Sequence, residues 1–126
     1  MKMIVDDRDG IYNTDIEINN GDKIISDHWL LKLDGKRHTL MVLEREDGWQ
    51  LMIGGGKKYY VINLQKDDEY FHFVNENGDQ AINIELCAGG QFSEFPEAMC
   101  ANHAQLSNIV ELFFSGQERK LRWELQ

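Results

Sequence analysis

The sequence predicts an α+β fold: an antiparallel β-sheet of about six or seven strands, with a short N-terminal helix and a C-terminal helix packed on one face. Three observations lead to this prediction. Short alternating runs rich in β-branched and aromatic residues recur between residues 15 and 86. Asp-Gly and Asn-Gly dipeptides separate some of these runs, as in β-hairpins. An apolar stripe with helical spacing follows near the C-terminus.

The length and composition indicate one soluble globular domain. The chain has 126 residues, and one domain usually has about 100–200 residues, so we expect residues 1–126 to form a single domain. The composition is 42% hydrophobic and 28% charged, which is typical of folded proteins. The sequence has no run of about 18 apolar residues and no apolar signal region at its start. We therefore expect a cytoplasmic protein that does not enter membranes.

The first two thirds of the chain predict strands around one short helix. Ser26 is expected to cap a helix that runs to Leu33 and ends near Gly35. Asp-Gly within 46–48 predicts a hairpin turn, and Asn77-Gly78 is a second hairpin signal. The alternating or β-branched runs predict strands at 15–18, 39–43, 49–53, 59–64, 70–74 and 81–86.

The glycine run Gly54-Gly55-Gly56-Lys57-Lys58 does not fit a phosphate-binding loop. Such a loop needs a glycine where Leu51 stands and a serine or threonine where Lys58 stands. A strand follows the run, whereas a phosphate loop leads into a helix N-terminus. We expect the glycines to interrupt the strand as a turn or a bulge.

The C-terminal part changes from strand periodicity to helical periodicity. Asn102 and Gln105 have the spacing of a capping box at a helix start. Gly116 stands where a helix often ends, and the alternating residues 121–125 predict a final strand. The helix between them is predicted by an apolar stripe formed by Leu106, Ile109, Val110 and Phe113.

The negative charge is concentrated in one segment. The net charge is −9, and residues 67–99 hold eight acidic residues with no lysine or arginine. A chain with this charge is a poor partner for nucleic acid, because phosphate binding needs basic groups. A concentrated negative face attracts a basic protein surface, although acidic residues can also serve only to keep a protein soluble.

The cysteines and histidines form no motif that indicates chemistry. Cys87 and Cys100 fit no disulfide framework and no C-x-x-C motif, so we expect reduced, partly buried thiols. The histidines (His28, His38, His72 and His103) lack the spacing of metal ligands. We expect no enzymatic activity, cofactor or metal. A Cys/His pair brought together by the fold is the open alternative.

Carboxylates and aromatic residues of the acidic segment are the candidate binding residues. Aromatic anchors surrounded by charge are typical of protein interfaces. Alternation predicts that if Phe71 and Phe73 face the core, Tyr70 and His72 face the opposite side. The aromatic candidates near or within this segment are Tyr59, Tyr60, Tyr70 and Phe92. They can also be explained as sheet-core aromatics. The expected contact residues are Asp67, Asp68, Glu69, Tyr70, Glu76, Asp79, Glu94 and Glu97.

Several short motifs together resemble the first-numbered family of immunity proteins from bacterial polymorphic toxin systems. The resemblance covers roughly residues 24–125. Most specific is the C-terminal third, where Phe95-Pro96 precedes a helix with Phe113, then Ser115-Gly116-Gln117-Glu118 and Leu121-Arg122-Trp123-Glu124. Similar features upstream are Trp29, the turn Asp34-Gly35, the strand from Thr39, and Leu51-Met52-Ile53-Gly54-Gly55-Gly56 before Tyr59-Tyr60-Val61.

The resemblance implies a cytoplasmic inhibitor that binds one cognate toxin domain and occludes its active site. Toxins paired with this family include nucleases and nucleic-acid deaminases, whose basic clefts an acidic protein can block. The family motifs mark turns and core positions, so they transfer no catalytic residues. Two other functions stay open: a binding module or homodimer unrelated to toxins, joined through an exposed strand edge, and a small Cys/His or carboxylate enzyme.

Overall fold

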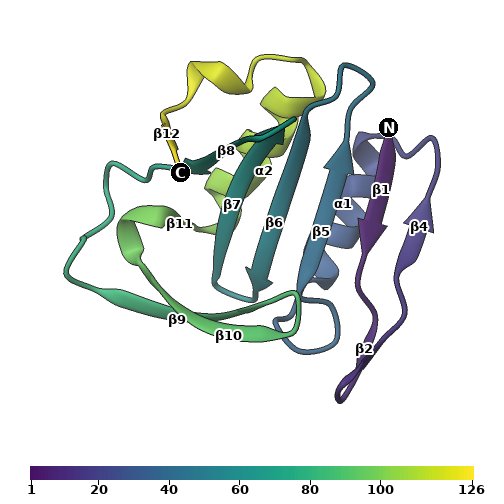
Figure 1. Ribbon diagram of the computed structural model, residues 1–126, viewed down its shortest axis with the longest axis horizontal. Coiled ribbons are helices and arrows are strands. Elements are labelled where there is room, and N and C mark those ends of the chain that lie inside the picture. Colours follow the sequence, from purple (N-terminus) through teal and green to yellow (C-terminus); the bar gives the residue numbers. More distant parts are fainter.

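A large antiparallel sheet with two helices on one face forms the centre of the computed structural model, which describes all residues, 1–126 (Figure 1). The predicted α+β fold class is therefore confirmed. The elements, in chain order, are β1 (Lys2–Val5), β2 (Arg8–Asp9), β3 (Tyr12–Asn13), β4 (Ile16–Ile18), α1 (Lys23–Lys32), β5 (Leu40–Glu44), β6 (Gln50–Gly56), β7 (Tyr59–Lys66), β8 (Glu69–Phe73), β9 (Asn83–Ala88), β10 (Gln91–Pro96), the 3₁₀ turn η1 (Glu97–Met99), β11 (Cys100–Ala101), α2 (His103–Phe114), the 3₁₀ turn η2 (Glu118–Lys120) and β12 (Trp123–Leu125).

The main sheet has eight strands in the order β12-β8-β7-β6-β5-β1-β4, and β11 pairs with β7. The short β11 pairs with Tyr60 and Val61 at the start of β7, whereas β8 pairs with the end of β7 from Asn63 onward. Two further two-stranded sheets lie outside it: β2 with β3, and β9 with β10. The N-terminal β1, which the sequence analysis did not predict, pairs with β4 and β5.

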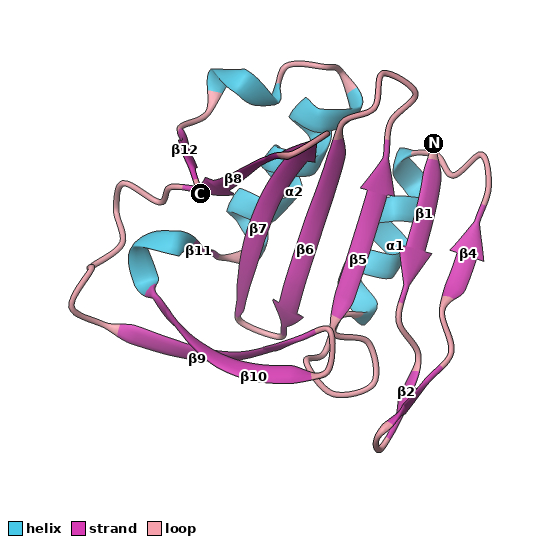
Figure 2. Ribbon diagram, viewed as in Figure 1, coloured by secondary structure: helices cyan, strands magenta, loops and turns pink.

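The core lies between the sheet and the helices, which pack on the same face (Figure 2). Alternate strand residues enter it, as expected from the two-residue period of a strand. The predicted stripe of α2 is fully buried there, at 0–1% exposure. The strand residues buried in this core include Met3, Val5, Met41, Leu43, Leu51, Ile53, Ile62, Leu64 and Phe73.

Local signals at α2 are confirmed in detail. The Asn102 side chain accepts a hydrogen bond from the Gln105 backbone N–H (2.8 Å), and the Gln105 side chain accepts one from the Asn102 N–H (2.9 Å). This is the reciprocal capping box. Gly116 follows the helix with a φ of 70°, the left-handed conformation that favours glycine after a helix.

The predicted start of α1 is wrong by one turn. Asp22, not Ser26, caps the helix, and its carboxylate accepts a hydrogen bond from the Ile25 N–H (2.9 Å). Ser26 lies inside the helix and is fully buried. The neighbouring Gly21 donates a backbone hydrogen bond to Met1 (2.8 Å), which holds the helix start against β1. A tertiary contact therefore selects the earlier of two good capping residues.

The glycine run continues β6 and does not interrupt it. Gly54 pairs with Val61, and Gly56 pairs with Tyr59. A Cβ atom at Gly54 would lie 2.5 Å from the Ala88 side chain, and one at Gly56 would lie 2.6 Å from the Leu33 carbonyl oxygen. The run is therefore needed because β9 and the α1–β5 loop both pass against this strand.

The Asn77-Gly78 signal marks a turn but not a hairpin. β8 and β9 do not pair, and Gly78 packs so closely on η1 that a Cβ there would lie 2.6 Å from Ala98 Cα. β9 pairs with β10 instead, in a hairpin that crosses one end of the sheet face opposite the helices (Figure 1). Leu86 of this hairpin packs on Val61 and Cys100 in a second, smaller apolar cluster.

The Gly116-Gln117-Glu118 motif has a structural role. Glu118 is buried and accepts two hydrogen bonds from the Arg45 guanidinium, at 2.8 and 3.0 Å. Its backbone carbonyl accepts a hydrogen bond from the Trp123 indole N–H (2.9 Å). The motif thus connects the end of α2, the β5–β6 turn and the edge strand β12.

Candidate protein-binding surfaces

The turn between β7 and β8 presents the first group of predicted contact residues. Asp67 and Asp68 form the turn, and Glu69 and Tyr70 begin β8. All four are exposed, and Asp67 adopts a φ of 53°, which aspartate tolerates better than most residues. None of the three carboxylates forms an ion pair or accepts a side-chain hydrogen bond within the chain. They are therefore available to a partner.

Three other predicted residues serve the loop between β8 and β9. Glu97 accepts a hydrogen bond from the Asp79 backbone N–H (3.0 Å), and the Asp79 carboxylate accepts one from the Ala81 N–H (2.9 Å). Glu76 lies 3.5 Å from Arg122 in an exposed ion pair. The structure brings Asp79 and Glu97 together, but it uses these carboxylates to hold the loop. They are weaker candidates for contact with a partner.

Glu94 lies on the outer face of the β9–β10 hairpin, in a different place from the turn. It stands directly opposite Glu85, and the next pair on the same face is Phe92 with Cys87. Like charges opposite each other destabilise an isolated hairpin, so a basic partner would relieve this pair. Phe92 is 71% exposed. The sequence analysis named Phe92 among the aromatic candidates but missed Glu85, although the alternation of residues 81–86 sets Glu85 on the face opposite Ile84 and Leu86.

The eight predicted residues do not form one site. The β7–β8 turn lies at one end of the sheet, and the β9–β10 hairpin crosses the other end (Figure 1). These residues are close in sequence but not in space, because the chain leaves the main sheet after β8 and β9 pairs with β10 instead. The acidic segment is thus divided among the β7–β8 turn, the β8–β9 loop and the β9–β10 hairpin.

The alternation predicted for β8 is confirmed. Phe73 is buried and packs on Trp123, with ring centroids 5.9 Å apart, and Phe71 packs against the same core. Tyr70 and His72 face the opposite side, where Nε2 of His72 lies 3.3 Å from the Glu124 carboxylate on β12. Tyr70 is therefore a surface aromatic residue.

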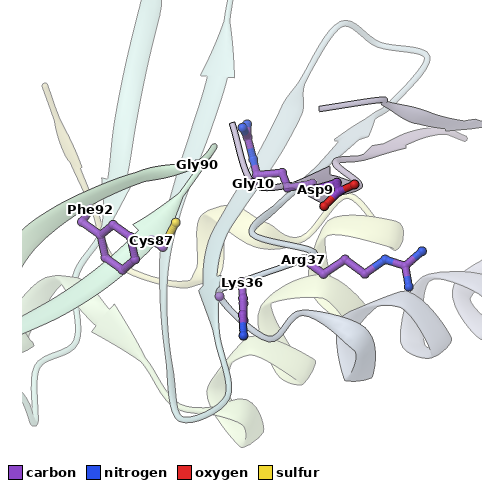
Figure 3. A pocket seen from close by; sticks show the side chains of 9 residues that line it. Asp9, Gly10, Lys36, Arg37, Cys87, Gly90 and Phe92 are labelled. Carbon is purple, nitrogen blue, oxygen red and sulfur yellow. The ribbon is translucent and has the colours of Figure 1, made fainter. Parts of the chain in front are cut away.

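A cavity of about 360 Å³ lies where the β2–β3 hairpin, the α1–β5 loop and the β9–β10 hairpin meet (Figure 3). Its lining includes the cationic residues Arg8, Lys36 and Arg37. Figure 3 shows Lys36 and Arg37 pointing away from Cys87 and Phe92, so the cavity has no point on which these groups converge. This arrangement is a gap between surface loops.

Internal ion pairs neutralise two of these three cations. Arg8 Nε lies 2.7 Å from the Asp6 carboxylate, and Arg37 Nε lies 2.7 Å from Asp7. The hydrogen bond from Arg37 lowers the pKa of Asp7 below its usual value, so this pair stays ionised. Lys36 forms no ion pair. The cavity walls are therefore built by salt bridges that hold the loops.

Asp34 stabilises the α1–β5 loop, which lines part of this cavity. Its Oδ1 accepts hydrogen bonds from the backbone N–H groups of Lys36 (2.9 Å), Arg37 (2.9 Å) and His38 (3.1 Å). Burial raises the pKa of Asp34, but the three backbone donors together hold it below its usual value. The ionised carboxylate therefore stabilises this loop.

Of the two cysteines, Cys100 has the surroundings of a structural residue, whereas Cys87 lines the cavity described above. Both are unpaired and buried. The Cys100 thiol donates to the Pro96 carbonyl (3.5 Å), and burial, together with the nearby Glu97 carboxylate, raises the pKa of this thiol to about 11. A thiol that stays protonated is a poor nucleophile. No three His, Cys, Asp or Glu side chains gather in a way that would hold a metal ion.

Residues 8–13, to which the sequence analysis gave no structure, form a small projecting hairpin. Two large apolar residues, Ile11 and Tyr12, lie at its tip and are 89% and 75% exposed. The Asp9-Gly10 dipeptide was the available signal, since Asp-Gly often marks a tight hairpin. The short strands, two residues each, gave too little alternation to support it.

Comparison with known proteins adds no family to this description. The chain matches no protein-family model, and no curated protein matches it significantly. Neither helix is long and apolar enough to cross a membrane.

Proposed function

We propose that this chain is an immunity protein that binds a cognate secreted toxin domain in the cytoplasm and neutralises it by occluding its active site. The partner is a protein, and no cofactor or nucleic acid takes part in the binding. A toxin that acts on nucleic acid, as a nuclease or a deaminase, best fits the charge of the chain. The resemblance in the C-terminal motifs led to this function, and the surface charge supports it.

The observation that carries the proposal is the set of unpaired carboxylates at the β7–β8 turn. Asp67, Asp68 and Glu69 are consecutive, exposed and free of internal ion pairs, with Tyr70 beside them. Three adjacent like charges repel one another, and no internal ion pair offsets this cost in folding free energy, so the turn suits a role outside the fold. Binding a basic surface is such a role.

Charge complementarity explains how such a chain would act on a nucleic-acid enzyme. These enzymes bind phosphates through lysine and arginine, and a protein with net charge −9 is attracted to the same groups. Attraction of this kind speeds encounter and weakens as salt screens it beyond about 10 Å. The inhibitor would compete with the substrate for the same cationic surface.

The first experiment is a binding assay with the toxin domain that the immunity function predicts, namely the C-terminal domain of a large secreted protein that we expect to be encoded beside this chain. We expect nanomolar or tighter binding, and rescue of cells that express the toxin domain. Absence of both binding and rescue would refute the immunity function. Measuring the association rate constant from low to high salt then tests whether the acidic surface contributes.

The second experiment reverses the charges of the turn. We expect Asp67→Lys/Asp68→Lys/Glu69→Lys to slow association at least about tenfold at low salt, because steering alone can raise rates by 10–1,000-fold. A matched comparison sets Asp67→Lys/Asp68→Lys against Glu17→Lys/Glu111→Lys, which changes the net charge equally on exposed residues of β4 and α2. Equal effects of the two pairs would refute the assignment of the turn but not the immunity function.

A second candidate function is self-association through the free edge of β12. This edge strand has no neighbour on one side and exposes Leu125. Exposed strand edges can pair with another copy of the chain. Light scattering over a wide range of concentrations would show a dimer if this edge is used, and a monomer at every concentration would exclude it.

A further inference from the structure

We propose that the β2–β3 hairpin is the element that enters the toxin, with Ile11 and Tyr12 seated in a concave cleft of the toxin domain. The proposal rests on the proposed function and names the contact that gives it affinity. It assigns a role to the N-terminal segment, which lies outside the residues that resemble the immunity family. The expected occupant of the surface is a protein cleft with an apolar pocket and a basic rim.

The hairpin is a separate unit that projects from one end of the molecule (Figure 1). Arg8 and Asp9 pair with Asn13 and Tyr12 in their own two-stranded sheet. Gly10 begins the two-residue loop with a φ of 62°, a conformation that glycine adopts without strain and that tight hairpin loops need. The side chains of Ile11 and Tyr12 therefore stand at the end of a narrow projection.

Nothing in the chain covers this tip. Ile11 and Tyr12 are 89% and 75% exposed, and a Cβ atom built at Gly10 would have no other atom within 4 Å. Neither residue belongs to an apolar cluster of the fold. Folding therefore gives no reason for two large apolar side chains here. Tyrosine is one of the residues that most often dominate the affinity of protein interfaces.

The base of the hairpin is held firmly. Asp6 is only 3% exposed and accepts hydrogen bonds from the backbone N–H groups of Thr39 (2.6 Å) and Leu40 (3.0 Å) and from Arg8 Nε (2.7 Å). Arg8 also donates its backbone N–H to the Arg37 carbonyl (2.8 Å). A tip on a fixed base loses little conformational freedom on binding, which favours affinity.

The charges near the tip indicate what kind of cleft it fits. Asp9 is paired across the hairpin with Tyr12, and Asp15 follows β3; neither carboxylate has a cationic partner. The arginines at the base are already neutralised by Asp6 and Asp7, and Lys36 on the wall of the neighbouring cavity is the cation there without an ion pair. The apolar tip is thus flanked by the carboxylates of Asp9 and Asp15. Such a surface is complementary to an apolar pocket with a basic rim. Clefts that bind nucleic acid have such rims.

A second apolar anchor lies on the same end of the molecule. Phe92 and Gly10 both line the cavity between the two hairpins (Figure 3). Phe92 is 71% exposed and lies next to the facing residues Glu85 and Glu94 on the outer face of β9–β10. Neither glutamate forms an ion pair within the chain. The toxin would therefore meet apolar anchors on two hairpins, each accompanied by free carboxylates.

The test replaces the two apolar side chains of the tip and compares the effect on binding with that of a matched substitution elsewhere on the surface. Ile11→Ser/Tyr12→Ser is set against Ile24→Ser/Leu31→Ser on the outer face of α1, where the side chains are 79% and 74% exposed. Each variant is assayed for binding to the toxin domain encoded beside this chain. We expect the tip variant to bind at least about 100-fold more weakly, mainly through faster dissociation, because buried anchors dominate affinity. The α1 variant is expected to change affinity less than about threefold.

The outcomes separate this proposal from the proposed function. Tight binding by the unmodified chain with an unchanged dissociation constant for the tip variant would overturn the role of the tip and leave immunity intact. Absence of binding by the unmodified chain would overturn both. Thermal unfolding of each variant shows whether its fold is intact. A benzophenone amino acid at position 12 provides an independent readout: crosslinks to the substrate cleft of the toxin support the proposal, and crosslinks confined to other surfaces overturn it.

Discussion

The buried pair of Arg45 and Glu118 predicts a large loss of stability when one partner is removed. The Glu118 side chain is 3% exposed and that of Arg45 is 14% exposed. Arg45 donates to both carboxylate oxygens, to the Phe113 carbonyl (2.6 Å) and to the exposed Asp47, and its guanidinium lies over the Phe113 ring. Hydrogen bonding to Glu118 raises the pKa of Arg45, so the cation persists at every pH at which the protein folds.

Glu118→Leu removes the carboxylate but keeps an apolar side chain of similar size. Breaking a buried pair costs about 3–5 kcal/mol, and we expect about 3 kcal/mol because Asp47 and the Phe113 carbonyl still bind Arg45. An unfolding entropy of about 2.1 cal/mol/K per residue over 126 residues converts each kcal/mol into about 4 °C of Tm. The expected fall in Tm is therefore about 12 °C. Glu118→Gln keeps one acceptor and should lower Tm by about 6 °C, half as much.

Thermal unfolding followed by circular dichroism measures these shifts, and a double variant tests their cause. Arg45→Met added to Glu118→Leu removes the cation that has lost its buried carboxylate partner, so Tm should rise again by at least half of the loss. If the double variant is less stable than Glu118→Leu alone, the loss comes from packing and not from the orphaned charge. A fall in Tm of less than about 2 °C for Glu118→Leu would refute the reasoning altogether.

Two further predictions concern backbone and pH. Gly116→Ala should lower the free energy of unfolding by only about 1 kcal/mol, because a Cβ there meets no atom within 4 Å and the cost is conformational. Gly56→Ala should lower it by at least twice as much, because its Cβ would meet Leu33 and Asp34 backbone atoms at 2.6–2.7 Å. Urea unfolding of the two variants measures both values. The folded-state pKa of Asp34 lies below its unfolded value, so its carboxylate stabilises the protein above about pH 3.8 and this contribution is lost as the pH falls through the lower folded value. The Tm of Asp34→Asn should therefore fall less steeply in acid than that of the unmodified chain, and equal slopes would contradict this role.

Local signals predicted those elements whose stability is decided locally. The α2 cap needs only Asn102 and Gln105, three residues apart, and the stripe from Leu106 to Phe113 needs only a regular helix. The direction of Phe71 and Phe73 likewise follows from strand alternation. In each case the interacting residues are close in sequence, so a pattern of spacing contains most of the physical information.

Elements decided by distant contacts could not be predicted in this way. Asp22 and Ser26 are both good caps, and the contact of Gly21 with Met1 selects the first. Gly56 belongs to a strand because the α1–β5 loop passes against it, a fact that no neighbouring residue reveals. The predicted contact residues are spread over separate parts of the fold for the same reason. Glu94 follows Glu69 in one acidic segment, but β9 leaves the sheet between them.

The two proposed contacts are too far apart to lie at the centre of one ordinary interface. The β2–β3 hairpin and the β7–β8 turn lie at opposite ends of the sheet, and β7 alone, with eight residues at about 3.3 Å each, is about 26 Å long (Figure 1). A standard interface covers about 800 Å² on each partner, which is a patch roughly 30 Å across. A toxin centred on the hairpin tip would reach the turn only at its margin.

The two contacts should therefore affect different rate constants. Side chains buried at the centre of an interface mainly slow dissociation, and charges at the rim mainly speed association. The Ile11→Ser/Tyr12→Ser substitutions should speed dissociation at any salt concentration. The Asp67→Lys/Asp68→Lys/Glu69→Lys substitutions should slow association. This effect should disappear as added salt shortens the screening length to about 3 Å at 1 M. If reversal of the turn charges instead speeds dissociation as much as loss of the tip does, the toxin lies along the whole length of the sheet, and the tip is not the centre of the interface.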